Sequence, residues 1–180
     1  MFRELGIPFS TLVANVDETP IEGETPNQLV ERLAELKAKA IIPPNSSDWV
    51  IAADTVVSLN GKVLGKPLDK RDAYRMLSEL SGNSHEVWGG FCLFNQASST
   101  TYIEACVSKV EFCSINALAI REYIESGEPM DKAGSYAIQG KAGAFVKRIE
   151  GSHSNIIGLP LAEVIAAFAT HSLLEPNPFN

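Results

Sequence analysis

The clearest pattern along the chain is a run of apolar residues at helical spacing over about 26–41. Thr25, with Gln28 three residues later, forms a capping box, and Pro26 suits the first helical position. The proline pair at 43–44 then ends the helix. The sequence therefore predicts one well-delimited helix here.

Lys37 breaks the apolar face of this helix. At about 100° per residue, it falls near the middle of the apolar sector. A lysine on a buried face is costly unless its charge has a partner. Either the long stem of Lys37 carries its ammonium past the edge of the core, or the side chain faces a polar cavity. An anion is expected nearby.

Short apolar runs and turn residues after position 48 predict several strands. The expected strands are 49–53, 55–59 and 62–64, then 87–94, 101–112 and about 144–149. Asn60-Gly61 supplies the positive φ of a two-residue hairpin turn between the second and third of them.

Three further helices are expected between or after these strands. They are a helix from the Asp69 cap to Gly82, one over about 115–126 and an apolar one over about 161–170 that should pack on a sheet. The fold class is therefore α/β, with an order too irregular for simple β-α-β alternation.

Composition and charge narrow the function classes. The 180 residues suit one domain, and the net charge of −7 leaves no electrostatic footprint for long nucleic acid or an anionic membrane. No apolar stretch approaches the roughly 20 residues of a bilayer span, and the chain opens on no signal peptide. We expect a cytoplasmic protein whose three cysteines are reduced and partly buried.

Carboxylates and lysines recur at turns. Asp54 follows a buried strand, where α/β sheets often place site residues, although an aspartate there is also a common turn residue or helix cap. Lys66, between Gly65 and Pro67, is either a positioned ammonium or a solvated loop lysine. The pair Asp17-Glu18 alone would be assigned to the surface.

The segment 131–143 combines glycines, lysines and one amide, so its backbone can approach a phosphate or a base closely. It matches neither the P-loop nor the dinucleotide-binding motif. Together with the carboxylates and lysines above, it indicates metal-assisted phosphoryl chemistry.

Nine short blocks, read in order, closely resemble the Maf family of nucleoside triphosphate pyrophosphatases. They are 16–20 (VDETP), 33–38 (LAELKA), 53–57 (ADTVV), 65–67 (GKP), 80–82 (LSG) with His85, 127–129 (GEP), 131–134 (DKAG), 138–140 (IQG) and 158–161 (GLPL). The resemblance covers about residues 5 to 170.

The resemblance implies a fold like that of the inosine triphosphate pyrophosphatases, with a mixed, twisted sheet and flanking helices in two lobes around a nucleotide cleft. It implies hydrolysis of a nucleoside triphosphate to the monophosphate and pyrophosphate with Mg²⁺ or Mn²⁺. By the same resemblance, Asp54 matches the family's proton acceptor, and the residues that match polar positions of its catalytic cleft are Glu18, Lys37 and Lys66. Asp54 and Glu18 are the expected metal ligands.

The same resemblance assigns the substrate. Thr55 and Gln139 stand at the family's specificity positions and match the branch that acts on dTTP and UTP, and Lys132 is a further substrate-binding candidate. An amide has one acceptor and two donors, so Gln139 can read a pyrimidine edge, canonical or modified. Such an enzyme removes unwanted nucleotides, and the family likeness also allows a homodimer.

One family feature has no counterpart in the chain. A Ser-x-Ser-Pro-Arg-Arg loop, which binds the triphosphate in the family, would precede Met1, so we expect a single Maf-like domain over 1–180 that lacks the N-terminal strand and this loop. The alternative function is therefore a non-catalytic, nucleotide-binding or regulatory member of the family. His85, alone in a loop, is read as a hydrogen-bonded structural residue.

Overall fold

The computed structural model describes residues 1–173, in which five strands form one sheet in the order β2-β1-β3-β4-β5. The strands are β1 (Trp49–Leu59), β2 (Lys62–Leu64), β3 (Ser84–Asn95), β4 (Thr100–Phe112) and β5 (Val146–Glu150). The helices are α1 (Pro26–Ala40), α2 (Lys70–Leu80), α3 (Ala117–Glu125), α4 (His153–Ile157) and α5 (Leu161–Thr170), with short 3-10 helices η1 (Glu128–Asp131), η2 (Ala133–Ser135) and η3 (Lys141–Phe145). The α/β class is confirmed.

All four strand pairings in the described residues are antiparallel, so the expectation of a mixed sheet is wrong for them. The turns explain this direction. Asn60 and Gly61 take φ values of 52° and 80° in the predicted two-residue turn between β1 and β2, and β3 returns as β4 after residues 96–99. Connections this short can join only antiparallel neighbours.

Strand β1 is longer than the sequence predicts. The two expected strands at 49–53 and 55–59 are one strand of 11 residues, and Asp54 lies inside it, opposite Gly90 of β3. The placement of Asp54 at a strand end is therefore wrong. Ladder hydrogen bonds with β3 run without interruption from Trp49 to Ser58, and this long-range pairing holds the aspartate in the strand.

Helix α1 matches its prediction closely. Its capping box is present, since the Thr25 side chain accepts a hydrogen bond from the Gln28 backbone and the Gln28 side chain accepts one from the Thr25 backbone. Leu29, Val30 and Leu33 are buried against β1 and β3. These buried side chains fix the helix on the sheet.

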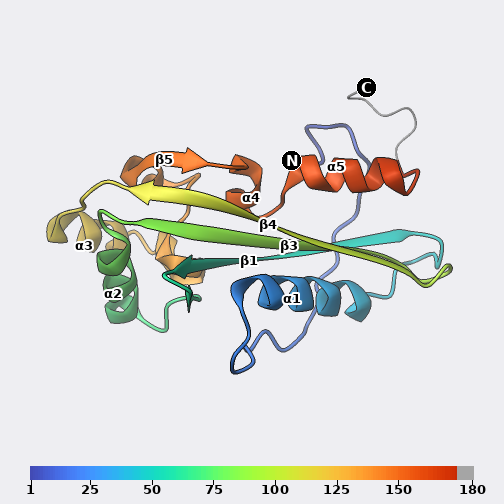
Figure 1. Ribbon diagram of the computed structural model, residues 1–180, viewed down its shortest axis with the longest axis horizontal. Helices are drawn as coiled ribbons and strands as arrows, with labels where there is room; N and C mark the ends of the chain where they lie inside the picture. Colours follow the sequence, from blue (N-terminus) through green and yellow to red (C-terminus); the bar gives the residue numbers. More distant parts are fainter. Residues whose placement is uncertain (174–180) are drawn as a thin grey trace.

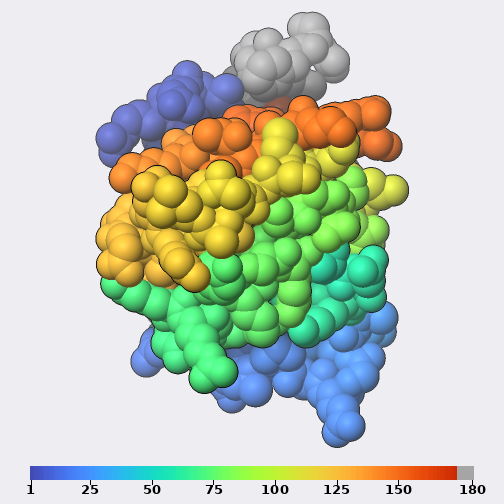
Figure 2. Space-filling model, turned by 90° about the vertical axis from the view of Figure 1, so that its left-hand side faces the viewer, coloured from blue at the N-terminus to red at the C-terminus, as the bar shows by residue number. Residues whose placement is uncertain are grey.

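The helices cover both faces of the sheet (Figure 1). Helix α1 lies on one face, and α5 lies on the other, where Val164 and Phe168 pack on Phe91 of β3 as the sequence predicts. Helices α2 and α3 close one end of the sheet. Figure 2, viewed toward that end, shows blue segments at the bottom, green and yellow segments in the middle and the orange C-terminal elements above them. In residues 1–173, no helix has the length and apolarity needed to cross a membrane.

Candidate active site

A compact cluster of three charges lies between α1 and β1. Lys37 Nζ donates to Asp54 Oδ1 at 2.6 Å and lies 2.6 Å from Glu18 Oε1. Only 10% of the Asp54 side chain and 18% of the Lys37 side chain are exposed, against 43% for Glu18. The anion that the sequence requires beside Lys37 is therefore present, and it is a pair of carboxylates.

Burial and pairing act in opposite directions on these groups. Burial raises the pKa of the Asp54 carboxyl, and this effect outweighs the hydrogen bond from Lys37, which lowers it. Burial also works against the charged form of Lys37, but its bonds to Asp54 and Glu18 prevail and raise its pKa. The more exposed Glu18 has its pKa lowered, mainly by the hydrogen bond from Lys37. One ammonium thus serves two carboxylates, and the cluster carries a net negative charge.

Lys66 joins this cluster from a loop. Its Nζ lies 3.7 Å from Glu18 Oε2, and 63% of its side chain is exposed. The loop is held at one end by Leu68, whose backbone N–H donates to Asp72 Oδ2 at 3.1 Å, and at the other by the Gly65 carbonyl, which accepts from the Gly134 N–H at 3.1 Å. The loop backbone around Lys66 is therefore held at both ends, and its largely exposed ammonium lies near Glu18.

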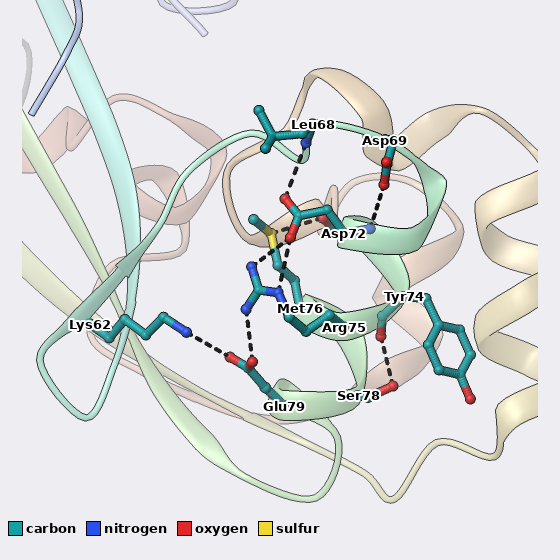
Figure 3. A network of polar contacts seen from close by, with 10 residues as sticks. Lys62, Leu68, Asp69, Asp72, Tyr74, Arg75, Met76, Ser78 and Glu79 are labelled. Carbon is teal, nitrogen blue, oxygen red and sulfur yellow. Dashed lines mark hydrogen bonds and ion pairs between the residues drawn. The ribbon is translucent and has the colours of Figure 1, made fainter.

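Helix α2 is in turn tied to the hairpin before this loop (Figure 3). Arg75 lies between Asp72 and Glu79, at 2.6 and 2.8 Å, and Lys62 of β2 reaches Glu79 at 3.6 Å. These exposed ion pairs contribute little stability each. The Lys62–Glu79 contact links β2 to α2 on either side of the loop that carries Lys66.

A cavity of about 250 Å³ lies on the opposite face of β1. It is lined by Thr55, Val57, Lys66, Val87, Asp131, Lys132, Ala133, Tyr136, Ala137, Ile138, Gln139, Ile156, Ile157 and Gly158. Pockets for drug-sized ligands measure about 300–1,000 Å³. The cavity therefore suits a flat ring with part of a sugar, and not a whole nucleoside triphosphate.

Three polar residues of this cavity are those that the family resemblance assigns to substrate binding. Thr55, Lys132 and Gln139 all line it. Lys132 is paired with Asp131 at 2.9 Å. Within the described residues, the Gln139 amide makes no side-chain hydrogen bond, so its donors and acceptor are free to meet a ligand.

The loop that carries Gln139 is anchored by two residues that sequence reasoning missed. Glu128 accepts hydrogen bonds from the Tyr123 hydroxyl at 2.9 Å and from the Lys141 N–H at 3.2 Å. The Tyr123 hydroxyl accepts one from the Ala137 N–H at 3.1 Å. Glu128 stands in the GEP block, but nothing in the sequence indicates which partner it takes.

The cavity also contains an aromatic wall that the sequence does not reveal. Tyr136 is buried, and its hydroxyl lies 2.8 Å from His85 Nε2. Burial lowers the pKa of His85 to about 4, so the imidazole is neutral near pH 7. The expected hydrogen bond of His85 is present, but the residue lies in β3 and not in a loop, so its expected placement is wrong.

The structure thus places the predicted site residues on two faces of one strand. Successive side chains of a strand point to opposite faces. Asp54 faces α1 with Lys37 and Glu18, whereas Thr55 faces the cavity with Gln139 and Lys132. Lys66 belongs to both groups, because it lines the cavity and approaches Glu18.

The outer edge of β1 connects the two faces. Within the described residues, β2 pairs with β1 only at Val57–Leu59, so no strand covers the edge beside Asp54 and Thr55. A ligand with a ring in the cavity and a long anionic tail can pass over this edge to the charged cluster. Two separate binding sites are not required.

The carboxylates of Glu18 and Asp54 suit a divalent cation that is also bound by phosphates. In residues 1–173, no group of three or more His, Cys, Asp or Glu side chains could hold a metal alone. Mg²⁺ is usually held by one or two carboxylates together with substrate phosphates. Glu18 and Asp54 provide those two carboxylates, so the site fits a cation that arrives with a phosphate ligand.

Comparison with known proteins gives a consistent result. The sequence model of a family described as "Maf-like protein" matches residues 1–171. A protein of Pelotomaculum thermopropionicum, named dTTP/UTP pyrophosphatase, is 45% identical over 164 residues, which are 91% of this chain and 86% of that protein. Proteins with the same name from Geobacter metallireducens (43% identical, 97% of this chain and 91% of that one) and Desulfotalea psychrophila (40%, 96% and 88%) are similarly related.

Proposed function

Because the chain belongs to the Maf family, we propose that it hydrolyses dTTP and UTP to the nucleoside monophosphate and pyrophosphate. The observation that supports this most strongly is the open edge of β1. At this edge the adjacent residues Asp54 and Thr55 lead from a ring-sized cavity to a cluster of carboxylates and ammonium groups. The base of a nucleoside triphosphate fits the cavity, and its phosphates can then reach the charged cluster.

In this proposal the cavity holds the base. The free amide of Gln139 meets the pyrimidine edge, and the neighbouring Thr55 faces the same space. A base with the wrong edge would leave those polar groups unpaired, which is an effective way to reject it. Lys132, a partly exposed lining residue, would meet the sugar or the first phosphate.

The charged cluster then performs the reaction at the α-phosphorus. Asp54 uses Oδ1 for Lys37, and within the described residues Oδ2 has no hydrogen-bond partner. Oδ2 is the oxygen that takes the proton from the attacking water. Lys37 and Lys66 offset the charge that develops on the phosphates and on the departing pyrophosphate.

A divalent cation, Mg²⁺ or Mn²⁺, held by Glu18 and Asp54 would supply further charge neutralisation along the phosphate chain. The carboxylates remain the protein's contribution to that site. The open edge and the fixed loop of Lys66 leave room for the phosphates beside them.

Pyrophosphate release tests the proposed function. We expect release from dTTP and UTP with Mg²⁺ or Mn²⁺, and little from dATP or dGTP. Asp54→Asn should lower kcat at least about a hundredfold, because general-base catalysis contributes about 10²–10⁴. Asp48→Asn, an exposed carboxylate in the turn before β1, is the matched control. Binding of dTTP without any release would instead support the non-catalytic alternative.

Two expectations about the whole protein stay predictions. One is a homodimer, which the molecular mass in solution tests. The other is a single Maf-like domain, for which a single cooperative unfolding transition is the expected result.

A further inference from the structure

We propose that the Lys37 ammonium occupies the position of the divalent cation in the nucleotide-free protein, so that the cation and this ammonium exclude each other. On cation binding, the head of Lys37 leaves the two carboxylates and turns to the phosphates. This inference rests on the proposed function, since it assigns the cation and the phosphates to the same cluster.

The ammonium of Lys37 is shared between two carboxylates. Nζ of Lys37 lies 2.6 Å from one oxygen of Glu18 and 2.6 Å from one oxygen of Asp54, so it bridges the two carboxylates symmetrically. A divalent cation held by the same two carboxylates would compete with this ammonium for their oxygens. Since Mg²⁺ binds oxygen at about 2.0–2.1 Å, an ammonium that stayed on both carboxylates would lie close to a like charge. The cation and the bridging ammonium therefore disfavour each other.

The exchange needs only small movements. Cation–oxygen bonds of about 2.1 Å are about 0.5 Å shorter than each of the two contacts of Nζ. Glu18 can follow, because it lies outside any helix or strand, its backbone has no hydrogen bond to another backbone group within the described residues, and 43% of its side chain is exposed. Asp54 is held in β1 and stays in place.

Lys37 is also free to leave in one direction. Its backbone is fixed in α1, but its side chain has four rotatable bonds. Its head contacts Asp54, beside which no strand of the described residues pairs with the outer edge of β1. That edge is the path of the phosphates in the proposed function. The displaced ammonium therefore has a new anion when nucleotide is present and none when it is absent.

This exchange predicts that cation and nucleotide bind cooperatively. Without nucleotide, cation binding breaks the two contacts of the Lys37 ammonium with Glu18 and Asp54 and leaves that ammonium without an anion, so the affinity for the cation is low. With nucleotide, the phosphates receive the ammonium and the affinity rises. By thermodynamic linkage, the cation increases nucleotide affinity by the same factor.

Binding of Mn²⁺ to the nucleotide-free protein, followed by the electron paramagnetic resonance of free Mn²⁺, tests the proposal without any assay of activity. Lys37→Met should bind Mn²⁺ at least about ten times more tightly than wild type, which corresponds to a difference of about 1.4 kcal/mol in binding free energy. Lys66→Met removes the same charge at 3.7 Å from Glu18 without vacating the bridging position, and should tighten binding far less. Equal affinities of Lys37→Met and wild type, or of the two variants, would overturn the proposal.

A second measurement uses the wild-type chain, so it does not depend on how a variant folds. Amine acetylation, read by mass spectrometry, should proceed faster at Lys37 when Mn²⁺ saturates the nucleotide-free protein. It should change little at Lys141, an exposed residue at the start of η3. Unchanged labelling of Lys37 under saturating Mn²⁺ would refute the exchange. Loss of pyrophosphate release with intact exchange would instead refute only the proposed function.

Discussion

Replacing Gly90 with alanine tests how α1 is seated on the sheet beside the charged cluster. Gly90 lies opposite Asp54 in the β1–β3 ladder. A Cβ atom there would lie 2.6 Å from both the carbonyl carbon and the oxygen of Val30, and 3.0 Å from the N of Glu31. All three atoms belong to the backbone of α1, so no side-chain rotation can relieve the clash.

The cost follows from that distance. Ordinary contacts between carbon atoms lie at about 3.5–4.0 Å, so α1 must move away from β3 by about 1 Å. Its buried residues Leu29, Val30 and Leu33 then lose part of their packing. Overpacking of this kind costs about 1–3 kcal/mol. Because the same helix carries Lys37, the bridge to Asp54 should also loosen.

Urea unfolding followed by circular dichroism measures this cost. Gly90→Ala should lower the free energy of unfolding by about 1–3 kcal/mol, with a fall in kcat/KM for dTTP in the folded fraction. Gly65→Ala is the control, because its Cβ would meet nothing within 4 Å and its φ is not positive. Equal stability of Gly90→Ala and Gly65→Ala would show that α1 does not pack on β3 as described.

Three further substitutions test separate parts of the structure. Asn155 is fully buried and donates to the Val87 carbonyl and to Ser108, so Asn155→Ala should lower the unfolding free energy by about 1–3 kcal/mol, and an unchanged urea midpoint would contradict this. Burial lowers the pKa of His85 to about 4. Because this pKa is depressed in the folded state, the stability that neutral His85 contributes is complete above the unfolded pKa of about 6.5 and is lost as the pH falls toward 4. Between these two pH values the free energy of unfolding of wild type should therefore fall by about 3 kcal/mol more than that of His85→Phe, at 1.36 kcal/mol per pH unit; parallel curves of stability against pH would refute the assignment. Gln139→Leu should reduce the preference for dTTP over dCTP, measured as a kcat/KM ratio, by about 10–100-fold; a retained preference would place base recognition elsewhere.

Local signals were enough to predict the elements that position the site. The capping box at Thr25 and the helical spacing after it gave α1, and the Asn-Gly pair gave the turn between β1 and β2. Lys37 was informative because a charge on an apolar helix face requires a partner, and that partner is present. These inferences depend on neighbouring residues only.

The position of Asp54 could not be predicted in this way. A polar residue after an apolar run usually ends a strand, and only pairing with Gly90, distant in the sequence, keeps Asp54 within β1. The same long pairing puts Asp54 and Thr55 on opposite faces, so the site has two compartments, one on each face of β1. The helix α4 was missed because its five residues are too few for a periodic signal.

Hydrolysis of dTTP in ¹⁸O-labelled water tests whether the cluster around Asp54 directs water to the α-phosphorus of a nucleotide whose base lies in the cavity. We expect ¹⁸O in dTMP and none in pyrophosphate for wild type, with both products nearly absent for Asp54→Asn. Label in the pyrophosphate, or undiminished labelling of dTMP by Asp54→Asn, would contradict it.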